Sequence, residues 1–139
     1  MSCLRLISTG NLLVRNKYLW AACTWTIAIT VLCLMSSSSF EDIRTFSIPG
    51  KDKYLHGVFY FIFTGLWYVV FHRVVKWPRR KSRYKAFMLA VSYGCFIELM
   101  QLWLTKDRSA DGLDALANTT GAALAVLVLW RIGKRKDKI

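Results

Sequence analysis

Long apolar segments alternate with short charged ones along this chain of 139 residues. Four apolar segments, at residues 18–35, 54–71, 86–104 and 113–132, are each 18 to 20 residues long. This length suits a helix that crosses the hydrocarbon core of a bilayer. Because hydrocarbon offers no partner to unpaired backbone groups, each segment is expected to be helical. The pattern predicts an all-α fold, an integral membrane four-helix bundle over residues 18–132.

Basic residues are concentrated at one end of this predicted bundle. Of the 20 Lys and Arg residues, 15 lie in residues 1–17, 73–85 and 131–138. The positive-inside rule places that end, with both termini, in the cytoplasm. We therefore predict a cytoplasmic N-terminal segment at 1–17, a four-span domain at 18–132 and a basic cytoplasmic tail at 133–139. A cleaved signal peptide is the alternative for the first segment, but its basic preamble and apolar core are both long for one.

The composition narrows the class of protein. A chain that is 55% hydrophobic and 20% charged is too apolar to be disordered. The net charge of +12 alone would suit nucleic-acid binding. Since the cations flank the spans, we interpret them as orientation signals that also contact anionic lipid, and we expect membrane lipids but no nucleic acid as partners. The four cysteines show no metal-ligand spacing, so no zinc site built on thiolates is expected, and none lies in an outer loop, so no disulfide is expected. No other metal and no cofactor is expected.

Polar side chains gather at the ends of the second, third and fourth spans that lie opposite the basic segments. Within each span they recur at steps of three and four residues, which places them on one helical face. Ionisable residues inside a span are costly and indicate a functional site. The three faces meet at one depth, so we predict a polar pocket open to the outside. The faces are Lys53, His56, Tyr60 and Thr64; Gly94, Glu98, Gln101, Thr105 and Arg108, if that helix continues past residue 104; and Asp111, Asp114, Asn118 and Gly121.

Each of these residues has a simpler structural interpretation when it is taken alone. His56 would be an interfacial histidine, and Asp111 and Asp114 would cap a helix. Gln101 and Asn118 would join helices through hydrogen bonds. Their convergence favours a binding site, and Glu98 is the hardest to explain otherwise because it lies well inside its span.

Small residues predict where the helices approach each other. Ala117, Gly121 and Ala125 form a line with four-residue spacing on the fourth span, which allows a neighbouring helix to approach closely. Gly57 and Gly65 are expected to allow the same close approach on the second span. The first span has no acidic, basic or amide residue. We expect it to shield the bundle as a lipid-facing wall.

Two stretches, residues 52–66 and 98–122, resemble the VanZ-like family of bacterial integral membrane proteins. The first carries the family pattern Asp-Lys-x-x-His-x-x-x-Tyr, and the second carries Glu-x-x-Gln, Arg-x-x-Asp-x-x-Asp and Asn-x-x-Gly. The residue pair before the arginine, Lys106 and Asp107, departs from the proline or glycine of many members. The resemblance implies a multi-pass protein of the bacterial cytoplasmic (inner) membrane, with a link to resistance against the lipoglycopeptide teicoplanin. It implies these ligand-binding residues: Asp52, Lys53, His56, Tyr60, Glu98, Gln101, Arg108, Asp111, Asp114 and Asn118.

Three functional hypotheses follow from these residues. The first is a binding protein for the head group of a cell-envelope lipid, a lipid-linked precursor or a lipoglycopeptide. The alternative is a membrane-embedded enzyme acting on such a substrate through His56, Glu98 and Asp114, in which Asp111 and Asp114 would hold a divalent ion. The third is proton-coupled solute movement with Glu98 titrating, which the apolar inner halves of the spans disfavour. The oligomeric state is left open.

Overall fold

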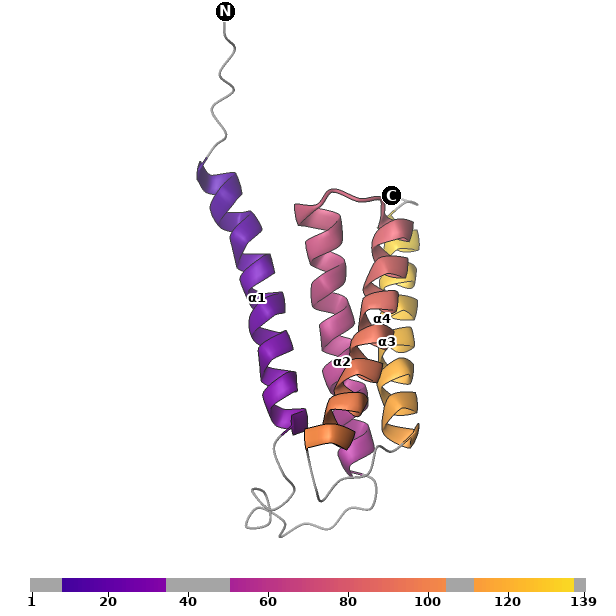
Figure 1. Ribbon diagram of the computed structural model, residues 1–139. Helices are drawn as coiled ribbons and strands as arrows, with labels where there is room; N and C mark the ends of the chain where they lie inside the picture. Colours follow the sequence, from indigo (N-terminus) through magenta and orange to yellow (C-terminus); the bar gives the residue numbers. More distant parts are fainter. Residues whose placement is uncertain (1–8, 35–50, 105–111, 137–139) are drawn as a thin grey trace, which may run out of the picture.

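The described part of the protein consists of four long helices (Figure 1). The computed structural model describes residues 9–34, 51–104 and 112–136, and all regular structure in these ranges is helical. A short π-helix, η2, continues the second helix. The elements are α1 (Thr9–Leu34), α2 (Lys51–Val69), η2 (Val70–Val74), α3 (Arg79–Leu104) and α4 (Gly112–Lys136). The predicted all-α, four-helix architecture is confirmed.

All four helices are long and apolar enough to cross a membrane. Their outer surfaces carry large exposed hydrophobic side chains, such as Ile27 on α1, Val58 on α2 and Leu116 on α4. Lipid tails solvate such side chains as well as a protein interior does, so a membrane bundle keeps them on its outside. Three of the helices extend well beyond the apolar segments, since α1 begins at Thr9, α3 at Arg79, and α4 ends at Lys136. Hydropathy marks only the part of a helix that lies in hydrocarbon, whereas the helix itself continues into the head-group region.

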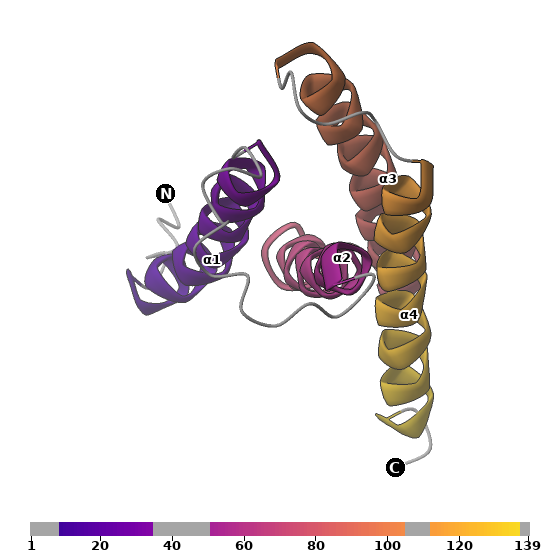
Figure 2. The ribbon, with the colours of Figure 1, turned by 90° about the horizontal axis from the view of Figure 1, so that it is seen from below.

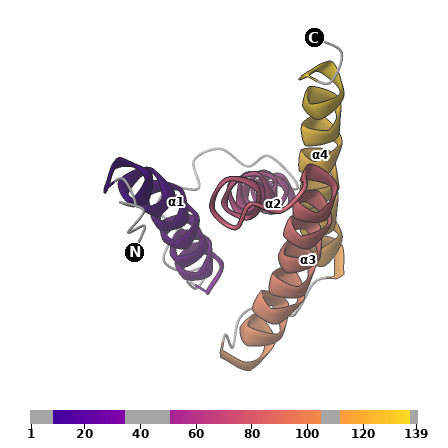
Figure 3. The ribbon, with the colours of Figure 1, turned by 90° about the horizontal axis from the view of Figure 1, so that it is seen from above.

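Helix α2 lies at the centre of the bundle. Viewed along the bundle, it stands between α1 on one side and the pair α3 and α4 on the other (Figures 2 and 3). The closest packing is between α2 and α4. The start of α1 and the end of α4 lie at the same end of the bundle (Figure 1). We call this the basic end, and the opposite end, where α2 and α4 begin, the acidic end.

Glycine allows the close approach of α2 and α4. Gly121 packs against the backbone of Gly57, as the small-residue pattern predicts, and Ala125 on the same line is buried. The packing role expected for Gly65 is wrong, because a Cβ at Gly65 would have no neighbour within 4 Å. The crossing lies near the start of α2, so only the first of its two glycines meets α4.

Helix α1 forms specific hydrogen bonds to the other helices of the bundle. The indole Nε1 of Trp25 donates a hydrogen bond to the backbone oxygen of Phe59 on α2 at 3.1 Å. Trp67 on α2 donates in return to the hydroxyl of Thr26 at 3.2 Å, and Thr30 is hydrogen-bonded to the Tyr93 hydroxyl on α3. In hydrocarbon such bonds have few competitors, so they help to fix the side of α1 that faces the bundle. These hydrogen bonds could not be predicted, because the first span has no charged or amide residue to indicate them.

Candidate functional site

Seven of the ten predicted site residues have side chains that the structure describes, and all seven belong to the acidic end. Arg108 and Asp111, together with the side chain of Asp52, lie outside the described residues. Of the seven, Lys53 and Asp114 are partly exposed, and the other five are buried. Six of them form what we call the polar cluster: Lys53, His56, Tyr60, Glu98, Asp114 and Asn118.

His56 connects α2 to α4 in the middle of the polar cluster. Its Nδ1 lies 3.2 Å from Oδ1 of Asn118, and its Nε2 lies 3.9 Å from Oδ2 of Asp114. Asp114 and Asn118 are one helical turn apart, so they face the same ring from successive turns of α4. An amide oxygen only accepts, so Nδ1 donates to Asn118. Nε2 then becomes a second donor, toward the carboxylate of Asp114, when the ring is an imidazolium.

Lys53 forms the solvent-side edge of the polar cluster. Its Nζ lies 3.8 Å from Oδ1 of Asp114, and its side chain is 39% exposed against 16% for Asp114. Lys53 and His56 are three residues apart on α2, and both meet the carboxylate of Asp114. The cluster therefore presents a cation at its rim and a carboxylate, a ring and an amide behind it.

The inner part of the polar cluster depends on a glycine. A Cβ at Gly94 on α3 would lie 3.3 Å from Cε1 of Tyr60 and 3.4 Å from Nδ2 of Asn118. Because Gly94 has no side chain, α3 can approach closely and cover the buried Tyr60 and Asn118. Gly94 was part of the predicted face of α3, and this contact gives it a packing role there.

Three buried polar atoms of the cluster lack a hydrogen-bond partner among the described residues. They are the hydroxyl of Tyr60, Nδ2 of Asn118 and Oδ1 of Asp114. Leaving such an atom unsatisfied costs about 1–3 kcal/mol. Native structures contain few of these atoms, and they indicate a place for water or a ligand. The cluster thus has hydrogen-bonding capacity that its own side chains do not use.

Glu98 and Gln101 lie one turn apart on α3, and both are buried. The carboxylate oxygens of Glu98 are shielded from solvent, and Glu98 lies near Tyr60. Gln101 turns to α1, where its Nε2 donates to the backbone oxygen of Cys33 at 2.7 Å. That contact matches the interpretation of Gln101 as a residue that joins helices, and its part in ligand binding stays a prediction.

Sequence reasoning missed two features of this region. The acceptor for Gln101 is a backbone carbonyl of Cys33, which no side-chain pattern could reveal. Thr64 shares a helical face with Tyr60, but its hydroxyl bonds to the Tyr60 backbone oxygen at 2.8 Å within its own helix. The described residues of the polar cluster pack against one another, and the open pocket expected at this level stays a prediction.

The fold and these side chains define a class of protein. It is a multi-pass membrane protein of four helices with a buried polar cluster at one end. The family model VanZ/LLP1 matches residues 23–133, which is most of the chain, so the protein belongs to the VanZ/LLP1 family. Comparison with curated proteins and with solved structures found no match.

Proposed function

We propose that this protein binds the polar head group of a cell-envelope lipid, a lipid-linked precursor or a lipoglycopeptide at the polar cluster. The observation that supports the proposal best is the set of three buried polar atoms, on Tyr60, Asn118 and Asp114, that lack hydrogen-bond partners among the described residues. A head group with hydroxyl or amide groups offers both donors and acceptors to these atoms.

The outer part of the polar cluster suits an anionic group. Lys53 is a partly exposed cation whose Nζ lies 3.8 Å from Oδ1 of Asp114, and an incoming phosphate or carboxylate can replace this contact. Large hydrophobic residues are exposed beside it, with Leu55 and Val58 on α2 and Leu116 on α4. These surfaces would solvate the acyl or polyprenyl chain while the head group reaches the cluster.

This proposal includes an orientation and a location. The acidic end faces the outside of a bacterial cytoplasmic membrane, and the basic end with both termini faces the cytoplasm. The described cations of α3 before residue 86 and of α4 after residue 130 support that orientation. Reporter fusions active only in the cytoplasm, placed at either terminus, test it, and inactive fusions at both termini would reverse the proposal.

The binding test uses the full chain in nanodiscs of zwitterionic lipid, with a labelled polyprenyl pyrophosphate as one probe and teicoplanin as the other. Lys53→Ala should weaken binding of the anionic probe by about tenfold or more, since a hydrogen bond to a charged group contributes roughly 1.5–3 kcal/mol. Tyr60→Phe, which removes only a hydroxyl, should weaken it too. Lys17→Ala is the matched control, because Lys17 is an exposed cation of α1 near the basic end.

Equal affinity in Lys53→Ala, Tyr60→Phe and the unmodified chain would show that the cluster is not the binding site. The role in resistance is tested separately. In a teicoplanin-susceptible bacterium, expression of the unmodified chain or of Lys17→Ala should raise resistance, and expression of Lys53→Ala or Tyr60→Phe should raise it less.

A second candidate function is catalysis on the same class of lipid. It is favoured by the position of His56 beside the carboxylate of Asp114, an arrangement that suits an oriented general base or acid. Glu98 would supply a second proton-transfer group. Turnover of a labelled lipid pyrophosphate that disappears in both His56→Ala and Glu98→Gln would establish catalysis, whereas binding without turnover would favour the first function.

A further inference from the structure

We propose that Asp114 determines the specificity of the polar cluster by selecting a lipid whose phosphate carries a hydroxyl-bearing group, such as a sugar or a glycerol. A lipid with the same phosphate but no hydroxyl would then bind less tightly. This proposal rests on the function proposed for the polar cluster and adds the chemical class of the head group. It follows from the hydrogen-bonding role of each unsatisfied atom in the cluster.

The two carboxylate oxygens of Asp114 face different neighbours. Oδ2 lies 3.9 Å from Nε2 of His56, and Oδ1 lies 3.8 Å from Nζ of Lys53. Both separations are longer than a hydrogen bond. Oδ1 is shielded from solvent and has no hydrogen-bond partner among the described residues. Because the oxygen of an ionised carboxylate only accepts, Oδ1 requires a donor.

Asn118 and Tyr60 have the opposite requirement. Nδ2 of Asn118 only donates, the hydroxyl of Tyr60 both donates and accepts, and neither has a partner in the described part of the chain. Asn118 is held in this orientation because its Oδ1 accepts from Nδ1 of His56 at 3.2 Å. The two side chains are neighbours, since a Cβ on Gly94 would lie 3.3 Å from Cε1 of Tyr60 and 3.4 Å from Nδ2 of Asn118. A required donor at Asp114 and a required acceptor at Asn118 thus come from successive turns of α4.

A hydroxyl group meets all of these requirements. An ionised phosphate oxygen accepts from Asn118 and Tyr60 but has no hydrogen to donate to Asp114. An ammonium group donates to Asp114 but cannot accept from Asn118. A hydroxyl donates with its hydrogen and accepts with its oxygen. A sugar or a glycerol carries two or more hydroxyls on neighbouring carbons, so one group can serve both side chains.

A phosphate at Lys53 strengthens this requirement. Lys53 is the cation that lies beside Oδ1 of Asp114, and the proposed phosphate replaces that contact. Oδ1 then faces a second anion, and anions repel each other more strongly where water is partly excluded. A hydroxyl of the same head group that donates to Oδ1 relieves this repulsion. Hydrogen bonds to a charged acceptor are among the stronger ones in proteins, so the hydroxyl should change the affinity measurably.

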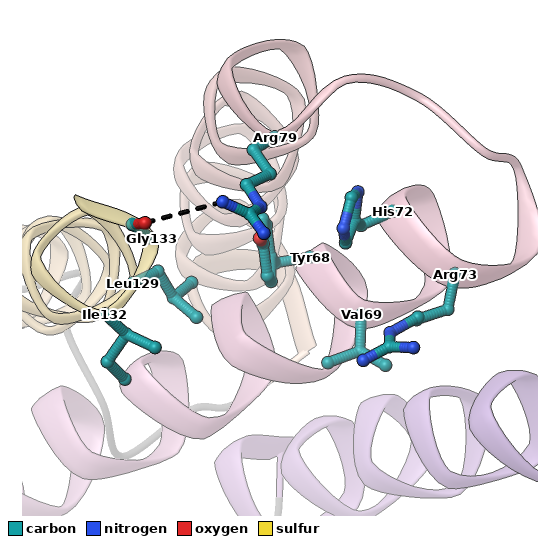
Figure 4. Close-up of a pocket in the computed structure, with 8 residues that line it drawn as sticks. All are labelled: Tyr68, Val69, His72, Arg73, Arg79, Leu129, Ile132 and Gly133. Atoms are coloured by element: carbon teal, nitrogen blue, oxygen red, sulfur yellow. Dashed lines mark hydrogen bonds between the residues drawn. The ribbon is translucent and has the colours of Figure 1, made fainter. Parts of the chain in front are cut away.

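A separate pocket at the basic end has to be distinguished from this site. Its volume is about 160 Å³, and its lining comes from α2, η2, α3 and α4, with Tyr68, Arg79 and Leu129 among the residues (Figure 4). Nη1 of Arg79 donates there to the backbone oxygen of Gly133 at 3.4 Å. Leu129→Trp would fill this pocket and leave the polar cluster unchanged, so it reports on any lipid that binds at the basic end.

Two pairs of probes test the proposal with the full chain in nanodiscs of zwitterionic lipid. In each pair one lipid carries hydroxyls and the other lacks them. The first pair is polyprenyl pyrophosphate linked to glucose and its cyclohexyl analogue, and the second is dioleoylphosphatidylglycerol and dioleoylphosphatidylpropanol. The hydroxyl-bearing member of at least one pair should bind about tenfold more tightly. A preference in the first pair identifies a sugar as the source of the hydroxyls, and a preference in the second identifies a glycerol.

Variants of Asp114 assign this preference to one carboxylate. Asp114→Asn keeps the shape and an acceptor oxygen but removes the charge, so the preference should fall to about threefold, and Asp114→Ala should abolish it. Thr120→Val is the matched control on α4, because the Thr120 hydroxyl is exposed and donates to the Leu116 backbone oxygen of its own helix at 2.8 Å. Thr120→Val and Leu129→Trp should each leave the preference unchanged, and circular dichroism should show the same helix content in every variant.

Three results would overturn the proposal. The first is equal affinity within both pairs while Lys53→Ala still weakens binding, which would leave the proposed function intact. The second is a preference that persists in Asp114→Ala, and the third is a preference that Leu129→Trp removes. If Lys53→Ala and Tyr60→Phe leave the binding of all four probes unchanged, the proposed function itself fails, and the selection by Asp114 fails with it.

Discussion

Gly57 and Gly121 lie backbone to backbone where α2 crosses α4. A Cβ built on Gly121 would stand 2.8 Å from the carbonyl carbon of Gly57 and 3.0 Å from its Cα. Both atoms belong to the main chain, so no side-chain rotation can relieve such an overlap. The polar cluster lies at the same end, because His56 precedes Gly57 by one residue and Asn118 precedes Gly121 by one turn. The glycine contact thus sets the distance at which His56 meets Asn118.

Gly121→Ala should destabilise the protein strongly. Overpacking against side chains costs about 1–3 kcal/mol, and a collision with backbone should reach the upper part of that range or exceed it. Thermal unfolding in detergent, followed by circular dichroism, measures the effect. Gly65→Ala is the matched control on α2, since its new methyl group would meet nothing within 4 Å. Similar melting temperatures for the two variants would contradict the crossing described here.

Gln101→Leu should loosen α1 at the acidic end. The change removes the hydrogen bond from Gln101 Nε2 to the oxygen of Cys33, which joins α3 to the last turn of α1. Interhelical hydrogen bonds of this kind contribute roughly 0.6 to 1.7 kcal/mol in membrane proteins. Hydrogen exchange should increase at the end of α1 and not at its middle, where Trp25 and Thr26 bond to α2. A uniform increase along α1 would argue against a local link.

Gly94→Ala should disturb the polar cluster with little loss of stability. The new methyl group would lie 3.3 Å from the Tyr60 ring and 3.4 Å from the Asn118 amide, so these side chains must shift by a few tenths of an ångström. We expect a destabilisation below about 1.5 kcal/mol, at the mild end of overpacking. Binding of the polyprenyl pyrophosphate should fall more than the melting temperature implies. Unchanged binding would mean that Tyr60 and Asn118 do not contact the head group.

The pair of Lys53 and Asp114 should contribute little to folding. A double-mutant cycle with Lys53→Gln and Asp114→Asn should give a coupling energy below about 1 kcal/mol, because the Lys53 side chain is partly exposed to solvent. The coupling should fall further as salt is added. A cycle with His56→Gln in place of Lys53→Gln tests the more buried contact at 3.9 Å and should keep its value in high salt. The reverse order of salt sensitivity would contradict the burial described here.

Hydropathy and charge were enough to predict the helices and the ends at which particular residues lie. The positions of Lys53, His56, Asp114 and Asn118 at one end follow from helix lengths and three- and four-residue spacing alone. The pairing of His56 with Asn118 rather than with Glu98 could not be predicted, because it depends on how far each helix is rotated about its axis. The contacts of α1 were missed for a similar reason, since hydroxyls and backbone carbonyls give no charge signal.

The sequence by itself determined that this is a four-helix membrane protein. An apolar segment of about 20 residues matches the thickness of a bilayer, and only a helix satisfies all of its backbone groups there. Only the tertiary structure decided which polar faces meet. Lipid is as apolar as the helix surfaces, so hydropathy cannot select the neighbours of a helix. Close packing at Gly57 and Gly121 and a few hydrogen bonds make that selection, and they act between residues more than 60 positions apart.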